Sequence, residues 1–374
     1  MLEGILEPSS PLFWGLIIAL ISFVIVIISR PLATYIKFVY PNAKFEAIGN
    51  PFIHEKELLR LIESKDLTSF KDILNILKDY QVEGDDVVSL QRSLDKGLIK
   101  TVEMMENDSS KALHQFYTVY YEKRDLVLIK ESLKSILSGT TKDTTLADNA
   151  YLPQTKELLN KLHEATKETL APILSAYGYT DTLIQLLITE PPDFFKIDFT
   201  LDQHILNKFK EVKVPYKCER AKKNYCQRLL DIMNIKYLLR AKHIGYDIDM
   251  CKTMFLGEGT ELALWRFKQM AEAEDIVNAI AALEGASYFS ALDEKKETYI
   301  KEGSVQIFEN TLDRLFLKHI KDISLQDYST LGPTLRFLVS KEYEIQNLKV
   351  IVKGLDEHVS TDAINRFIVT EAMT

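Results

Sequence analysis

Cysteine is scarce in this sequence of 374 residues, and its placement excludes a disulfide scaffold and a structural zinc site. The three cysteines, Cys218, Cys226 and Cys251, form no C-x-x-C pair and have no zinc-like spacing with the scattered histidines. An odd number of cysteines without a regular framework is typical of a protein from a reducing compartment. We therefore expect three free thiols.

The sequence also lacks the short motifs that carry most enzymatic chemistry. It contains no G-x-x-x-x-G-K-[ST] phosphate loop, no H-E-x-x-H and no G-x-S-x-G. The segment from Gly257 to Thr260 lacks the lysine and the preceding strand of a phosphate loop, so it predicts a turn followed by a capped helix. His243 and His319 are predicted to be surface or groove residues. We expect no catalytic residue, no cofactor and no metal, and we predict that the chain is not an enzyme.

An excess of positive charge is missing as well. The chain has 46 basic and 54 acidic side chains and a formal net charge of −8, which argues against nucleic acid as the main partner because phosphate binding needs clustered cations. The basic residues are densest in one tract, which consists of Lys208, Lys210, Lys213, Lys217, Arg220, Lys222 and Lys223. This tract is either the solvated surface of a helix or an electrostatic contact site for an acidic partner.

One long apolar run stands out near the N-terminus. From Leu12 to Ser29 the sequence LFWGLIIALISFVIVIIS has no charge, and 18 helical residues extend for about 27 Å, close to the thickness of a hydrocarbon core. Pro11 suits the first turn of a helix, Trp14 suits a membrane interface, and Arg30 followed by Pro31 predicts the other end. The run therefore predicts one transmembrane helix.

Two alternatives to a transmembrane helix remain open at this stage. A cleaved signal peptide is disfavoured because Glu3 and Glu7 precede the run without any lysine or arginine, and no small-x-small cleavage site follows. A buried core helix is the second alternative. If the run does span a membrane, the flanking Arg30, Lys37 and Lys44 place the body of the protein in the cytoplasm and the N-terminus outside.

The rest of the chain follows a helical period and predicts an all-α protein. Apolar residues recur at helical spacing, as at Leu90, Leu94, Leu98 and Val102, and alternating strand-like runs are nearly absent. Helix starts are predicted after Asp86, Thr260 and Ser324. Turns are predicted at 138–139, 190–192, 257–259 and 332–333, where glycine and proline occur.

A self-similar hexapeptide recurs three times with the pattern acid-x-x-Asn-aliphatic-Lys. Its key residues are Asp125, Leu128 and Lys130 in the first copy, Asp231, Asn234 and Lys236 in the second, and Glu344, Asn347 and Lys349 in the third. Leu128 replaces the asparagine in the first copy. Arg240 follows the second copy, and Asn42 with Lys44 forms a degenerate fourth copy in YPNAK.

The spacing of the copies predicts three domains in tandem. The copies lie 106 and 113 residues apart, which exceeds the period of solenoid repeats and indicates whole small domains. We predict a membrane anchor at residues 1–31 and helical repeat domains at 32–138, 139–245 and 246–374, the last with closing helices at the C-terminus.

The residue types of the motif favour a structural role. Asparagine is a mediocre helix former, so its recurrence in an aliphatic helix suggests a specified hydrogen bond to a neighbouring helix or loop. The acid and the lysine are five residues apart and diverge around the helix, so we expect each to contact another element. Direct contact with a partner protein is the alternative.

These stretches resemble the C/d family of central-stalk proteins from A-type and V-type ATPases. The resemblance lies in YPNAKFEAIGNPFIHEKELLRLIES, YCQRLLDIMNIKYLLRAK and EYEIQNLKVIVKGL, and it covers roughly residues 38 to 370. Two features depart from the family pattern. Leu128 weakens one copy of the motif, and the apolar run precedes the family pattern, which usually begins near Tyr40.

The resemblance implies three similar helical domains around a pseudo-threefold axis, forming a funnel. The wide end would receive the D and F proteins of the central shaft, and the other face would rest on the membrane ring of proteolipids. The function would be transmission of torque, without catalysis, in proton or sodium transport linked to ATP. The basic tract is then a candidate for contact with acidic loops of the ring or the shaft.

A part of the rotor cannot trail a helix through the surrounding lipid, because the stator would obstruct it. We therefore expect residues 12–29 to project into the lumen of the proteolipid ring. A membrane-anchored helical scaffold unrelated to the ATPase is the alternative function. A membrane-tethered hydrolase or transferase is disfavoured because acid, base and nucleophile signatures are missing.

Overall fold

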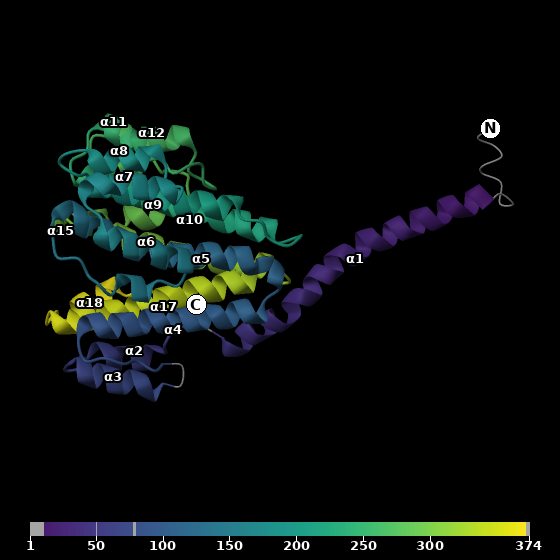
Figure 1. Cartoon of the computed structure of the whole chain (residues 1–374), viewed down its shortest axis with the longest axis horizontal. Coiled ribbons are helices and arrows are strands. Elements are labelled where there is room, and N and C mark those ends of the chain that lie inside the picture. The colour runs from purple at the N-terminus through teal and green to yellow at the C-terminus, as the bar shows by residue number, and fades with distance from the viewer. Residues whose placement is uncertain (1–10, 50, 78–79, 372–374) are drawn as a thin grey trace.

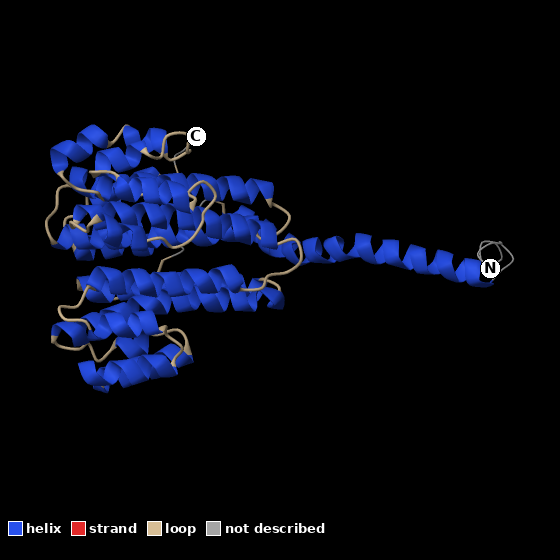
Figure 2. Ribbon diagram, turned by 90° about the horizontal axis from the view of Figure 1, so that it is seen from above, coloured by secondary structure: helices blue, strands red, loops and turns tan. Residues whose placement is uncertain are grey.

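A computed structural model describes residues 11–49, 51–77 and 80–371 of the chain. Within these ranges the protein is helical and has no strand (Figures 1 and 2), so the expectation of an all-α protein is confirmed. The α-helices are α1 (Pro11–Ile48), α2 (Glu55–Ile62), α3 (Leu67–Ile76), α4 (Val87–Asp108), α5 (His114–Ser138), α6 (Pro153–Glu164), α7 (Lys167–Ala176), α8 (Asp181–Ile188), α9 (Phe194–Glu211), α10 (Glu219–His243), α11 (Ile248–Thr253), α12 (Leu264–Glu272), α13 (Ile276–Ala281), α14 (Phe289–Asp293), α15 (Lys296–Glu302), α16 (Gln306–Gln326), α17 (Gly332–Asp356) and α18 (Thr361–Phe367). Short 3₁₀ helices lie at Lys111–Leu113 and Leu146–Asn149.

Some of the predicted helix boundaries are correct. Helix α4 begins at Val87, and the carboxylate of Asp86 accepts hydrogen bonds from the backbone N–H groups of Val88 and Ser89. Helix α5 ends at Ser138, where Gly139 takes a left-handed conformation with a φ of 66°. The turn at 190–192 separates α8 from α9, and the one at 257–259 lies between α11 and α12.

Other boundaries are wrong because tertiary contacts override the local signal. Thr260 does not begin a helix, since its backbone N–H donates to Asp231, and α12 begins at Leu264. Ser324 lies inside the last turn of α16. Residues 332–333 open α17 and do not form a turn. Proline is well suited to that first helical turn, where its missing N–H costs nothing.

Six long helices form the centre of the body. In the order α4, α5, α9, α10, α16, α17, each long helix packs against the next, and α17 returns to pack against α4. The shorter helices cover the outside. Helices α2, α3 and α18 pack around α17, α6 to α8 pack around α5 and α9, and α11 to α15 pack around α10 and α16 (Figure 1).

Aromatic side chains join several of the long helices in the interior. The ring centroids of Phe116 and Phe209 lie 5.8 Å apart, those of Phe209 and Tyr225 6.1 Å apart, and those of Tyr225 and Phe316 6.1 Å apart. These four residues come from α5, α9, α10 and α16 and are buried. Aromatic pairs at these distances add to the burial of their apolar area, so the long helices form one packed core.

Helix α1 projects away from this body (Figures 1 and 2). It continues for 38 residues through Pro31 and Pro41 to Ile48, so the predicted helix end at Arg30 is wrong. Its apolar window is long and hydrophobic enough to cross a membrane, and none of that window is buried in the structure. This exposure excludes the alternative of a buried core helix. The first ten residues, including Glu3 and Glu7, lie outside the described part of the chain.

Candidate functional site

In the second copy of the motif, α10 holds the loop between α11 and α12. The buried carboxylate of Asp231 accepts hydrogen bonds from the backbone N–H groups of Thr260 and Leu262, at 3.0 and 2.9 Å. Gly259 lies so close that a Cβ atom there would come within 1.9 Å of the Asp231 carboxylate. The Asn234 amide donates to the carbonyl of Gly257 at 2.9 Å and accepts from the N–H of Leu256 at 2.8 Å.

In the third copy, α17 holds segments from both ends of the chain. The Glu344 carboxylate accepts from the backbone N–H of Ile53 at 3.2 Å and from the hydroxyl of Tyr80 at 2.6 Å. The Asn347 amide binds both backbone groups of Val369, donating to its carbonyl at 2.7 Å and accepting from its N–H at 2.9 Å. The third copy thus binds a segment before α2 and a segment after α18.

The first copy keeps the acid and omits the amide. On α5 the Asp125 carboxylate accepts from the backbone N–H groups of Tyr151 and Leu152, at 2.9 and 3.0 Å. Leu128, which stands in place of asparagine, is partly buried and packs against the hydrophobic core. The bound segment lies 26 to 27 residues after this acid but 29 to 31 residues after Asp231. The first loop is therefore shorter than the second. It lacks the stretch that corresponds to Leu256 and Gly257, whose backbone groups Asn234 binds in the second loop.

Each lysine of the motif binds an aspartate on another long helix. Lys130 pairs with Asp202 on α9 and Lys236 pairs with Asp313 on α16, both at 2.6 Å. The third pair joins Lys349 to Asp95 on α4, at 2.7 Å. These ion pairs follow the packing order of the long helices.

The acceptor aspartates were not singled out from the sequence. Asp95, Asp202 and Asp313 are 107 and 111 residues apart, close to the period of the motif, and this repeated spacing is the signal that would have found them. Each also binds the helix that follows it in the packing order. Arg124 donates to Asp95 at 2.7 Å, while the hydroxyls of Tyr237 and Tyr343 donate to Asp202 and Asp313.

The carboxyl groups of the motif are buried, and burial changes their pKa values. Burial raises the pKa of Asp125, Asp231 and Glu344, although the hydrogen-bond donors around them act in the opposite direction. Glu342, also on α17, is buried between helices, which by itself would raise its pKa. Lys123, 2.8 Å from its carboxylate, and Arg124 nonetheless lower that pKa below the ordinary value.

Three other residues singled out from the sequence lie elsewhere. Arg240 forms an ion pair with the buried Glu309 on α16, and so strengthens the junction that Lys236 also makes. His243 is exposed, as expected. His319 is partly buried, with its ring 5.7 Å from that of Tyr288. The prediction was of a surface or groove residue, and this partly buried position does not contradict it. The described residues contain no group of three potential metal ligands.

Most of the basic tract serves the fold. Lys208 pairs with Glu122 at 2.6 Å, and Lys210 donates to the carbonyl of Leu256 at 3.2 Å. Lys222 donates to the carbonyls of Lys210 and Val212. Arg220 pairs with the buried Asp327 at 2.7 Å.

The other lysines of the tract, Lys213, Lys217 and Lys223, are exposed. The Lys217 ammonium lies 5.3 Å from the ring of Tyr216. Lys213 and Lys223 form no ion pair within the described part of the chain.

The long helices form three hairpins, α4–α5, α9–α10 and α16–α17, and the base of α1, residues 30–44, contacts the connecting end of each. The Arg30 guanidinium lies 4.6 Å from the ring centroid of Tyr216, in the loop between α9 and α10. Lys44 pairs with Asp108 at the end of α4, at 2.6 Å. The Asn42 amide donates to the carbonyls of Tyr328 and Thr330, which join α16 to α17, at 2.7 and 3.1 Å. The degenerate fourth copy of the motif therefore attaches α1 to the body.

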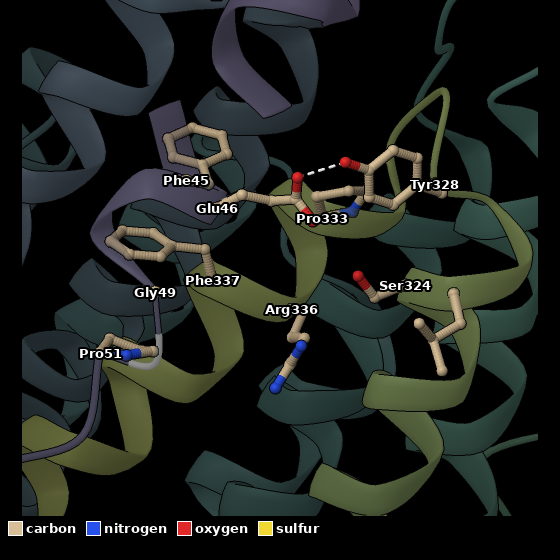
Figure 3. Close-up of a pocket in the computed structure, with 10 residues that line it drawn as sticks. Phe45, Glu46, Gly49, Pro51, Ser324, Tyr328, Pro333, Arg336 and Phe337 are labelled. Carbon is tan, nitrogen blue, oxygen red and sulfur yellow. Dashed lines mark hydrogen bonds between the residues drawn. The ribbon is translucent and has the colours of Figure 1, made fainter. Parts of the chain in front are cut away.

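A cavity of about 190 Å³ lies where α1 meets α16 and α17 (Figure 3). The rings of Phe45 and Phe337 stack there, with centroids 5.1 Å apart and planes 13° from parallel. The hydroxyl of Tyr328 donates to Glu46, as the dashed line in Figure 3 marks. The stacked rings and the paired carboxylate attach the last turns of α1 to α17 and to the loop before it.

Comparisons with known proteins show which family the chain resembles. A family model described as ATP synthase (C/AC39) subunit matches residues 41–367. The C subunit of the A-type ATP synthase from Methanothermobacter thermautotrophicus is 27% identical over 361 residues, which cover 94% of this chain and 93% of that protein. Proteins of the same name from Methanocaldococcus jannaschii and Pyrococcus furiosus are each 26% identical. They cover 93% and 89% of this chain respectively, and 90% of their own length.

Coverage of 94% leaves too few residues outside the Methanothermobacter alignment for it to begin after Ser29. The similarity therefore extends into the apolar run, whereas the family model begins at residue 41. On the strength of the family match over most of its length, this chain belongs to the ATP synthase (C/AC39) subunit family.

Proposed function

We propose that this chain is the non-catalytic rotor socket of an A-type ATP synthase, which couples a central shaft to a membrane ring of proteolipids. Family membership supports a role as a part of an ATP synthase. The observation that carries the coupling role is a closed circuit of polar contacts between the long helices. The three lysine–aspartate ion pairs alternate around it with the contacts of the same aspartates to Arg124, Tyr237 and Tyr343, and Lys349 on α17 closes the circuit at Asp95 on α4. A closed circuit suits a part that bears torque, because a packed body without a free edge resists twisting.

The circuit supports three similar units at 32–138, 139–245 and 246–374, related by a pseudo-threefold axis. In this division α5, α10 and α17 are corresponding motif helices. Asp125 and Asp231 each bind the segment that opens the following unit, and Glu344 binds Ile53, which opens the first. The motif residues then serve mainly to lock each unit to the next.

In this proposal α1 crosses the membrane inside the lumen of the ring. Its apolar window is exposed, and its base touches all three hairpin ends, which converge where a pseudo-threefold axis would leave the body. A position near that axis lets the helix turn with the rotor and avoid the stator. The positive charges of Arg30, Lys37 and Lys44 favour an orientation with the body in the cytoplasm and the N-terminus outside.

The two ends of the body have different partners in this proposal. The end with the hairpin loops faces the ring, since α1 leaves from it, and the opposite end receives the D and F proteins of the shaft. The exposed Lys213 and Lys217 lie in the loop between α9 and α10, and Lys223 lies one turn into α10, so all three belong to the ring-facing end. They are candidates for contact with acidic loops of the ring. The complex would link ATP to transport of protons or sodium ions.

Imaging of the assembled complex by electron cryo-microscopy tests the proposal directly. We expect one copy of the chain on the axis of the ring, with its hairpin loops towards the membrane. A copy beside the ring, or attached to the peripheral stalk, would contradict the rotor role. A chain without residues 1–30 should be retained less well on purified rings. Unchanged retention would argue against the lumen position and leave the rotor role intact.

A further inference from the structure

Helix α1 has two apolar faces beyond Arg30, and only one of them meets the body. The face towards the body consists of five buried residues: Thr34, Phe38, Pro41, Asn42 and Phe45. The opposite face carries Leu32, Ile36, Val39 and Tyr40, which are 56%, 63%, 65% and 61% exposed. Residues four, seven and eight positions apart share one side of a helix, so these four side chains form a continuous stripe, here called the outer stripe.

A lipid bilayer alone cannot cover the outer stripe. Residues 12–29 already fill the hydrocarbon core, and the headgroup layer adds only about 5 to 8 Å on each side. At a rise of about 1.5 Å per residue, Val39 and Tyr40 lie about 15 Å beyond Ser29. On the axis of the ring, where the proposed function puts it, α1 would run along the membrane normal, so tilt does not bring these residues closer to the bilayer. The far half of the stripe therefore lies in water unless protein covers it.

The polar residues of this part of α1 lie beside the outer stripe and leave it unbroken. At about 100° per residue, Arg30 and Lys37 fall on one flank and Glu46 falls on the other. A helix that is apolar on two opposite faces is typical of one enclosed by protein on both sides. The body covers one of these two faces. We therefore expect the other face, the outer stripe, to pack against a second apolar surface that is continuous with the membrane.

We propose that the outer stripe docks against the inner wall of the proteolipid ring where that wall rises out of the bilayer at its cytoplasmic mouth. This inference rests on the proposed function and adds a specific contact to it. The occupant is an apolar helical wall, because the stripe continues the apolar run that enters the membrane and carries no charge of its own. Asn42 and Lys44 attach α1 to the body. With its outer stripe against the ring, α1 would then connect the ring to the body and transmit torque between them.

Site-specific photo-crosslinking in native membranes tests the contact. A benzophenone amino acid replaces Val39 in the full-length tagged chain, in cells that contain the whole complex. The same amino acid replaces Leu20, within the apolar run, and Ile76 on α3, which is 79% exposed on the outer side of the body. After irradiation the tagged chain is purified and the mass of each adduct is measured.

We expect the Val39 probe to capture the proteolipid and the Ile76 probe not to capture it. A Val39 probe that captures only lipid, a second copy of this chain or nothing, in a complex that still contains the proteolipid, would overturn the docking of the stripe. Capture of the proteolipid by the Leu20 probe in that same complex would leave the lumen position standing. If the chain does not co-purify with the proteolipid at all, the proposed function itself fails.

Discussion

The amide of Asn347 binds both backbone polar groups of Val369, a residue that lies 22 positions further along the chain. The amide of Asn234 accepts from the N–H of Leu256, which is also 22 positions further along. The two amides therefore accept from a backbone N–H at the same spacing. Each also donates to a carbonyl of the same segment, that of Val369 in the third copy and that of Gly257, one residue later, in the second. In the second copy the loop continues without a break to the residues that Asp231 binds. In the third copy the donors to Glu344 come from a different part of the chain, namely the N–H of Ile53 and the hydroxyl of Tyr80.

Replacement of Asn347 by alanine should destabilise the protein by about 2 to 4 kcal/mol. The substitution leaves the N–H and the carbonyl of the buried Val369 without partners, and each unsatisfied buried group costs about 1 to 3 kcal/mol. Denaturant unfolding in detergent, followed by circular dichroism, measures the change. Asn160→Ala, at an exposed position on α6, is the control and should change stability by no more than about 0.5 kcal/mol. Equal effects of the two substitutions would refute the anchoring role.

Restoring the motif in the first copy should weaken the protein. Leu128→Asn would place an amide against the hydrophobic core, next to a loop too short to offer the groups that Asn234 binds. A buried amide without partners and a lost apolar contact together cost about 2 to 4 kcal/mol. The same unfolding measurement applies, with Leu128→Met as the control of similar volume. A gain in stability would mean that the loop before α6 can supply the missing hydrogen bonds.

The sequence predicted those contacts that are indicated by a few neighbouring residues. It did not predict those that join residues far apart in the chain. An asparagine inside an aliphatic helix suggested a specific hydrogen bond, and Asn234 and Asn347 do bind neighbouring loops. The aspartate partners of the lysines have no local signal, since they lie 72, 77 and 254 residues away, and only their repeated spacing could have indicated them. Pro31 suggested a helix end, yet α1 continues because its residues beyond that point pack on the body.

Stability should depend on pH through His319 in a predictable direction. Burial, with a smaller contribution from the nearby Arg228, lowers the pKa of its imidazole from about 6.5 to about 4. As the pH falls from about 7 to about 4, the unfolded chain binds a proton there that the folded chain does not, so stability decreases and then levels off below about 4. The full shift corresponds to about 3 kcal/mol, and to about 1 to 2 kcal/mol after allowance for solvent screening of the partly exposed ring.

The variant His319→Phe isolates this contribution because it keeps a ring beside Tyr288 and removes the titrating group. We expect the stability difference between the variant and the unsubstituted protein to shift in favour of the variant as the pH falls across this range. Unfolding free energies measured at several pH values give that difference. The same substitution at the exposed His163 is the control. A difference for His319→Phe that stays constant with pH would contradict the assigned origin of the effect.

Two neighbouring lysines of the basic tract should behave in opposite ways. The ammonium of Lys222 holds the carbonyls of Lys210 and Val212, so Lys222→Met removes charge-assisted hydrogen bonds and should cost about 1.5 to 3 kcal/mol of stability. The exposed Lys223 makes no such contact, and Lys223→Met should change the stability of the isolated chain by less than about 0.5 kcal/mol.

In binding to the ring, the order of the two variants should be reversed, so that Lys223→Met has the larger effect and Lys222→Met the smaller. If Lys223 faces acidic loops of the ring, Lys223→Met will lower retention of the chain on purified rings at low ionic strength. That loss will fade as added salt screens the attraction in the unsubstituted protein as well. Pull-down of rings at increasing salt measures retention, and Lys222→Met, kept below its unfolding transition, provides the matched comparison. Retention of Lys223→Met equal to that of the unsubstituted chain at every salt concentration would remove Lys223 from the ring contact and leave Lys213 and Lys217 as the remaining candidates.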